Sequence, residues 1–201
     1  MKLLAALVHA AAAASQVEVD RLAVVFDSLA PLDTGDKGSP ISKARSVAVQ
    51  FPSFPASQVR RSTAGWTLEY VNFTLGTLDI PKDGSLWLQP KFFLLGLPHC
   101  TKSDALKRIP IETIAKRVTF QVFPPSPIVL DPTTTYWFTV HSNGETKDKL
   151  PIWLDGTKTF SAENDPRKEV LVAYTESEGG NWGVAVPVEN RLVPSLQVYA
   201  S

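Results

Sequence analysis

Few side chains in this 201-residue chain combine the types and the spacing that catalysis needs. His99 and Cys100 are adjacent, but one histidine and one cysteine lack the number of ligands that a zinc site requires. A nucleophilic serine or cysteine needs a positioned base, and outside the N-terminal segment only His99 and His141 could supply it. We therefore predict that the protein is not an enzyme and needs no cofactor. A glycosidase stays open as an alternative, because sequence alone does not place two carboxylates across a cleft.

Two aspartates are candidates for a metal site. Asp33 and Asp36 lie within residues 31–42, a stretch with two prolines and two glycines that is typical of a loop. Carboxylate and carbonyl oxygens of such loops can hold a calcium ion. However, the spacing of the two aspartates matches no defined calcium-binding loop, and aspartates often stabilise turns. We expect turn residues and keep calcium as the alternative.

Aromatic side chains near loops and strand ends are the candidates for ligand binding. Apolar faces of sugar rings stack on exposed aromatic rings, and Tyr136, Trp153 and Trp182 are placed to offer them. The competing interpretation is core packing, because a β-domain easily absorbs five tryptophans in its interior. Exposed rings would favour a carbohydrate-binding module.

A glycosylation sequon is present at Asn72-Phe73-Thr74. If the protein passes through a eukaryotic secretory pathway, Asn72 is a possible glycan site. A polar pair that faces solvent is the alternative.

The composition gives no indication of a nucleic-acid partner and favours a β-rich fold. Lys+Arg and Asp+Glu each number 20, so the chain has no global field that would favour nucleic acid. Sixteen prolines and a single methionine are typical of strands joined by rigid turns. The single cysteine, Cys100, rules out a disulfide within the chain, so stability must come from the core.

The first residues predict a compartment. Lys2 is followed by an apolar run and by small residues at 12–15, the pattern of a secretory signal peptide. The run is too short for the roughly 20 apolar residues of a membrane span. We therefore predict a signal peptide at residues 1–15, a single β-sandwich domain at residues 16–201, and a secreted or cell-surface protein. A buried N-terminal helix is the alternative.

Alternating apolar and polar residues, separated by turn residues, recur along the chain and predict about ten strands. The expected strands lie at residues 17–28, 44–51, 65–76, 84–95, 117–123, 136–141, 151–155, 168–175 and 193–200. Pro90 restricts one of them to an edge, a bend or two short strands. The set predicts an all-β fold, an antiparallel jelly-roll-like sandwich of two sheets.

The pattern within the strands also predicts which side chains face the core. In residues 65–76, Leu68 breaks the parity of Val71, Phe73 and Leu75, and a bulge near residues 69–70 would turn all four inward. Asn72 and Thr74 would then point outward. In the last strand, Leu196, Val198 and Ala200 alternate with Gln197 and Tyr199.

The stretch Leu130-Asp131-Pro132-Thr133-Thr134-Thr135-Tyr136-Trp137-Phe138-Thr139-Val140 predicts a turn that leads into a central strand. Tyr136, Phe138 and Val140 share one face, while Trp137 and His141 share the other. Aromatic mass on both faces indicates a strand that is covered on both sides or borders a groove. After it, Asn143-Gly144 predicts an exposed turn.

Several segments together resemble the choice-of-anchor R domain family of exported surface proteins. They are Ser-Val-Ala-Val-Gln-Phe at 46–51, Trp-Thr-Leu at 66–68, Val-Asn-Phe-Thr-Leu-Gly at 71–76, Leu-Asp-Pro-Thr-Thr-Thr-Tyr-Trp-Phe at 130–138, Gly-Gly-Asn-Trp at 179–182 and Pro-Ser-Leu-Gln-Val-Tyr-Ala at 194–200. The resemblance implies an extracellular jelly-roll-like sandwich, an accessory module with no defined catalytic residues. The chain departs from the family in a longer stretch at 97–116 and in showing no recognisable anchor.

These observations predict a secreted, non-enzymatic structural or adhesive module. Its partners would be other subunits of an extracellular assembly or surface glycans, not nucleic acid. A carbohydrate-binding module that uses exposed aromatic side chains is the alternative.

Overall fold

The structure is a computed structural model that describes residues 22–29, 37–53, 66–94, 107–145, 149–159, 170–177, 180–185 and 192–201. The predicted signal peptide at residues 1–15 lies outside these residues, as do Asp33, Asp36, His99 and Cys100. Their predicted roles stay predictions. The regular elements of the described residues are all β-strands, and none of these residues forms a helix that could cross a membrane.

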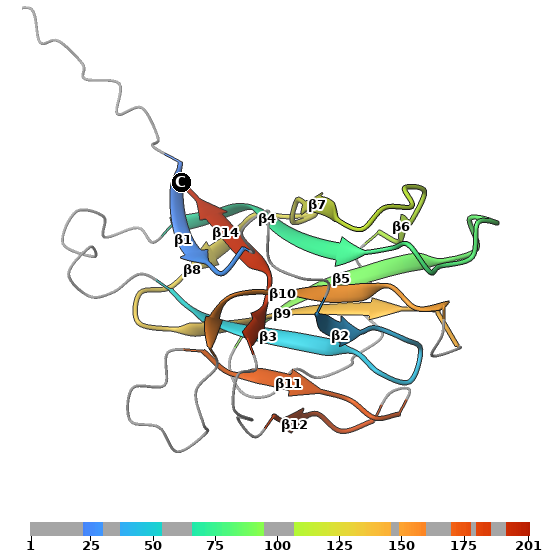
Figure 1. Cartoon of the computed structure of the whole chain (residues 1–201). Coiled ribbons are helices and arrows are strands. Elements are labelled where there is room, and N and C mark those ends of the chain that lie inside the picture. The colour runs from blue at the N-terminus through green and yellow to red at the C-terminus, as the bar shows by residue number, and fades with distance from the viewer. Residues whose placement is uncertain are drawn as a thin grey trace, which may run out of the picture.

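The strands form two antiparallel sheets, as predicted (Figure 1). The eight-stranded sheet has the order β1-β14-β4-β10-β13, while β2 pairs with β10, and β7 and β8 pair with β4. Its strands are β1 (Ala23–Asp27), β14 (Leu196–Ala200), β4 (Trp66–Gly76), β10 (Ile152–Thr159), β13 (Leu192–Pro194), β2 (Gly38–Pro40), β7 (Val118–Val122) and β8 (Ile128–Leu130). The first and last described strands are therefore neighbours, because β1 pairs with β14.

The six-stranded sheet has the order β12-β11-β3-β9-β5-β6. Its strands are β12 (Gly183–Val184), β11 (Val172–Tyr174), β3 (Val47–Pro52), β9 (Thr135–Ser142), β5 (Trp87–Leu94) and β6 (Ile109–Pro110). The stretch that predicted a central strand is β9, which pairs with β3 on one side and β5 on the other. The all-β fold of two antiparallel sheets is confirmed.

Aromatic rings join the two sheets at the centre of the molecule. Phe138 of β9 lies 5.4 Å from Phe73 of β4 and 5.9 Å from Trp153 of β10, measured between ring centroids. The indole Nε1 of Trp153 donates a hydrogen bond of 2.7 Å to the carbonyl oxygen of Ser195. A buried ring system of this size supplies much of the apolar burial that stabilises a sandwich.

The predicted bulge in β4 is confirmed. Tyr70 pairs with Tyr199 and Leu68 pairs with Ala200, so Glu69 is the extra residue. Leu68 consequently joins Val71, Phe73 and Leu75 in the core. Asn72 is half-buried on the opposite side of the strand.

Thr74, also predicted to point outward, is nearly buried. Its Oγ1 lies 3.2 Å from Oγ1 of Thr119 on β7, and its backbone N–H donates to Oγ of Ser195. Thr74 was predicted to point outward, but these two contacts cover it. They were not predictable from the local pattern, because both partners come from distant parts of the chain.

Pro90 lies inside one continuous strand, β5, opposite Val140. On its other side, in the described part of the chain, β5 pairs with β6 only at Trp87 and Leu88, so Pro90 has a partner strand on one side. A proline, which has no backbone N–H, is expected at such an edge position.

The turn before β9 is held by its own tyrosine. The backbone N–H of Asp131 donates a hydrogen bond of 2.7 Å to the hydroxyl of Tyr136. Thr133 has a φ of 60°, which is uncommon for a β-branched residue and marks the tightest point of the turn. Thr134 donates its N–H to Oγ of Ser53 and accepts a bond from the N–H of Ser53. The turn is thus attached to the end of β3.

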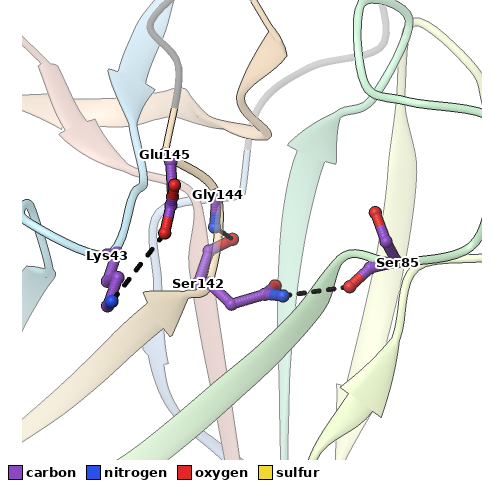
Figure 2. A network of polar contacts seen from close by, with 6 residues as sticks. Lys43, Ser85, Ser142, Gly144 and Glu145 are labelled. Atoms are coloured by element: carbon purple, nitrogen blue, oxygen red, sulfur yellow. Dashed lines mark hydrogen bonds and ion pairs between the residues drawn. The ribbon is translucent and has the colours of Figure 1, made fainter.

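The loop after β9 is attached to two neighbours (Figure 2). The side-chain amide of Asn143 donates to the carbonyl oxygen of Ser85 at 2.9 Å. The backbone N–H of Lys43 donates to the carbonyl oxygen of Gly144 at 2.8 Å, and its Nζ lies 3.8 Å from Oε1 of Glu145. Gly144 is buried. The Asn-Gly turn, predicted to be exposed, is therefore partly covered by its contacts.

Replacement of Tyr136 by phenylalanine removes the acceptor for the Asp131 N–H and keeps the ring. We expect a loss of about 1 kcal/mol in the free energy of unfolding, measured by urea denaturation.

The same residue predicts a pH dependence. Burial raises the pKa of Tyr136 above its ordinary 10.0, because the phenolate would lose hydration, and the charge of Asp131 adds to this, while the hydrogen bond from the Asp131 N–H opposes it. The folded protein holds the phenolic proton more tightly than the unfolded chain. This stabilisation is complete below about pH 10 and is lost as the pH rises through the folded-state pKa. The unfolding free energy of the wild type should therefore fall more steeply above pH 10 than that of Tyr136→Phe; equal slopes would contradict the assignment.

Gly156 of β10 lies directly against the backbone of Ser28. A Cβ at this position would sit 1.6 Å from the carbonyl oxygen of Ser28, which also accepts the N–H of Thr157. We expect Gly156→Ala to destabilise the fold by about 1–3 kcal/mol or more, measured by thermal unfolding. Gly183→Ala is the matched control, because a Cβ there meets nothing within 4 Å. Equal midpoints for the two variants would show that the close approach at Gly156 is not rigid.

Candidate binding face

The aromatic residues predicted to bind a ligand are buried. Tyr136 and Trp153 belong to the core between the sheets, with exposures of 2% and 0%. Their rings contact Phe51 and Phe73 respectively. Neither ring has a face free for a sugar, so the competing interpretation of core packing describes both.

Trp182, the third candidate, lies outside that core but is 8% exposed. It belongs to a second apolar cluster with Trp137, Leu171, Ala48 and Ala173, on the outer side of the six-stranded sheet. Trp137 is therefore core-like, although it faces away from the sandwich interior. Among the described residues, the indole N–H groups of Trp137 and Trp182 have no hydrogen-bond acceptor.

Ser46 and His141 form a pair of catalytic residue types that the sequence did not reveal. Oγ of Ser46 lies 2.9 Å from Nδ1 of His141, the distance of a nucleophile from its base. Ser46 is 5% exposed, and its backbone is bonded to Thr175 of the neighbouring segment. The Ser46 hydroxyl is therefore largely shielded from solvent. The described residues hold no group of three or more His, Cys, Asp or Glu side chains that could bind a metal.

The outer side of the eight-stranded sheet carries two rows of side chains that run across the strands. We call them together the aromatic–amide face. The aromatic row is Val24, Tyr199, Tyr70 and Phe123, and the amide row is Asp27, Gln197, Asn72 and Gln121. Each row contains one residue from each of four neighbouring strands, β1, β14, β4 and β7 (Figure 1). In the aromatic row the fourth residue, Phe123, directly follows β7.

The rings of the aromatic row contact one another. Tyr70 and Tyr199 are stacked at 4.4 Å with an angle of 25° between their planes. Phe123 lies 5.7 Å from Tyr70, tilted by 51°, and is 61% exposed. The two tyrosines therefore cover each other's faces, and Phe123 is the ring with the most free surface.

Hydrogen bonds connect the two rows at one end. The hydroxyl of Tyr199 donates to Oε1 of Gln197 at 2.8 Å, and Nε2 of Gln197 donates to Oδ2 of Asp27 at 3.0 Å. The pKa of Tyr199 is raised, first by partial burial and then by Tyr70 and the charge of Asp27. The phenol therefore keeps its proton, and its donor role, well above neutral pH.

At the other end of the amide row, the side chains of Asn72 and Gln121 make no hydrogen bond to the part of the chain that the structure describes. Asn72, the sequon residue, lies between Gln121 and Gln197 in the row. The alternation of β4 and β14 had already indicated that Asn72, Gln197 and Tyr199 point outward. The order of the strands, which makes them neighbours, was not readable from the sequence.

A scan against protein-family models and a search of curated proteins found no match for this chain. The resemblance to the choice-of-anchor R family therefore stays a prediction.

Two tryptophan variants test the difference between the clusters. Trp153→Phe removes a bonded N–H and leaves the Ser195 carbonyl without its donor, while Trp182→Phe removes an N–H that has no acceptor in the part of the chain that the structure describes. Because an unsatisfied buried group is costly, we expect Trp153→Phe to lose about 1–2 kcal/mol more stability than Trp182→Phe in urea denaturation. A larger loss for Trp182→Phe would show that its N–H has a partner in solution.

Proposed function

We propose that the protein is a secreted, non-enzymatic adhesive or structural module of an extracellular or cell-surface assembly. The aromatic–amide face is its contact surface. The observation that carries this proposal is the distribution of exposed apolar side chains. Five large hydrophobic residues of the described chain are exposed, and four of them, Leu22, Val24, Phe123 and Val129, lie on or beside the outer side of the eight-stranded sheet. Apolar patches of this kind are typical of interaction sites.

The compartment in the proposal rests on the signal-peptide pattern of residues 1–15 and on the family resemblance. The contrast between the two outer faces supports the role of the surface. The six-stranded sheet buries Trp137 and Trp182 on its outer side and leaves Trp87 and Phe93 partly exposed, whereas the eight-stranded sheet carries the exposed Phe123 and Val24. Keeping apolar side chains in water has a cost that a partner surface would offset.

Carbohydrate binding is the second candidate for the same surface. The row of carboxamides beside the aromatic row favours it, because these groups suit hydroxyl-rich ligands. The residues involved differ from Tyr136, Trp153 and Trp182, which are buried.

The test is fractionation of the source organism that expresses the full chain, with the protein detected by an antiserum. We expect the wild type in the cell-surface or matrix fraction. In the double variant Val24→Ser, Phe123→Ser, the fraction of the protein found in the medium should rise several-fold. Both side chains are exposed, so their replacement should remove the contact with the partner and leave the fold intact. Leu78→Ser, which changes an exposed leucine in the turn after β4, is the control and should behave as wild type.

Two outcomes would overturn the proposal. One is wild-type protein that stays in the cytoplasm, or that leaves the cell and associates with nothing. The other is covalent labelling of Ser46 by a fluorophosphonate probe, which would reveal an activated serine and point to an enzyme.

A further inference from the structure

We propose that the aromatic–amide face binds a neutral polysaccharide chain that lies across β7, β4 and β14. This inference rests on the proposed function, because it names the ligand class of the same surface. None of its residues was among the ligand-binding candidates of the sequence analysis, which were Tyr136, Trp153 and Trp182.

The charge of the face indicates a neutral ligand. Among the eight residues of the two rows, Asp27 is the one charged side chain, and its carboxylate already accepts a hydrogen bond from Gln197. Neither row contains lysine or arginine, the residues that bind carboxylate, sulfate or phosphate groups. An anionic polysaccharide would find no cation in either row and would meet the carboxylate of Asp27.

The amide row indicates a hydroxyl-rich ligand. A carboxamide has an acceptor oxygen and a donor NH2, so it can pair with a sugar hydroxyl in either direction. Gln121 and Asn72 are adjacent in the row and make no hydrogen bond to the described residues. Neighbouring strands are about 4.8 Å apart, which is close to the length of one pyranose unit in an extended chain. A chain across the strands can therefore place one sugar over each strand.

The aromatic row supplies the apolar side of the same track. Phe123, tilted from Tyr70 and largely exposed, can stack on the apolar face of a sugar ring. Tyr70 and Tyr199 are stacked on each other, so they form a wall of ring edges and hydroxyl groups beside the chain. The strongest contact should therefore be at Phe123 and Gln121, the β7 end of the track.

The other end is already ordered. The bonds from Tyr199 to Gln197 and from Gln197 to Asp27 fix the orientation of the Gln197 amide before a ligand arrives. Fixed side chains lose less conformational entropy on binding. A second copy of the chain is a less suitable occupant, because a protein surface would have to pair each carboxamide to avoid burying it unsatisfied.

Affinity electrophoresis in gels that contain a soluble polysaccharide tests the inference. The probes are mixed-linkage β-glucan, xyloglucan and galactomannan, with a carboxymethylated glucan as the charged comparison. We expect retardation by at least one neutral probe. Phe123→Ser and Gln121→Ala should each weaken it about tenfold, in line with the loss of one stacking or hydrogen-bonding contact.

Matched controls are Leu78→Ser for the phenylalanine and Gln89→Ala for the glutamine, both outside the face. Thermal unfolding of each variant shows that the fold is kept. Retardation lost with the face variants and kept with the controls would establish the site.

Three results would overturn the inference. They are no retardation by any neutral probe, retardation that the face variants leave unchanged, and retardation by the carboxymethylated glucan alone. If the protein still fractionates with the cell surface through Val24 and Phe123 in the first case, the adhesive function stands and its partner is a protein. If both experiments fail, the proposed function fails with the inference.

Discussion

The contact among Phe73, Phe138 and Trp153 is the interaction on which the rest of the sandwich depends. These rings come from β4, β9 and β10, so one cluster joins the two sheets at distances of 5.4 to 5.9 Å. The indole of Trp153 also donates to the carbonyl oxygen of Ser195, between β13 and β14. One side chain thus connects both layers and the C-terminal strands. Because the Trp153 ring is buried in these contacts, it has no free surface for a ligand. An aromatic residue near a predicted loop is therefore a poor guide to a binding site.

The two outer surfaces of the sandwich differ in how far their aromatic side chains are buried. On the six-stranded sheet, Trp137 and Trp182 form a second buried cluster over Ala48 and Ala173. On the eight-stranded sheet, Gln197 and Tyr199 of β14 and Tyr70 and Asn72 of β4 are partly exposed. Because both surfaces carry aromatic residues, composition does not distinguish them. What distinguishes them is how far the rings are covered: Trp137 and Trp182 are buried, whereas Phe123 is 61% exposed.

Local pattern was enough to predict the direction of most strand side chains. The parity break at Leu68 predicted the bulge at Glu69, and the alternation of β9 separated Phe138 from Trp137 correctly. Features that depend on neighbours distant in sequence were not predictable. Ser46 meets His141 because β3 pairs with β9, and Tyr70 meets Tyr199 because β14 pairs with β4. A single sequence carries the period of each strand but not the order of the strands, and both outer rows are products of that order.

The six-stranded sheet ends in strands of two residues, β12 and β6. Each offers very little unpaired backbone to a strand from another molecule, and Pro110 removes one donor from β6. A long unpaired edge would instead expose a row of backbone groups to pairing with another molecule. The two short strands thus limit, over part of each edge, the backbone with which another molecule could pair, while residues 89–94 of β5 pair with β9 alone in the described part of the chain.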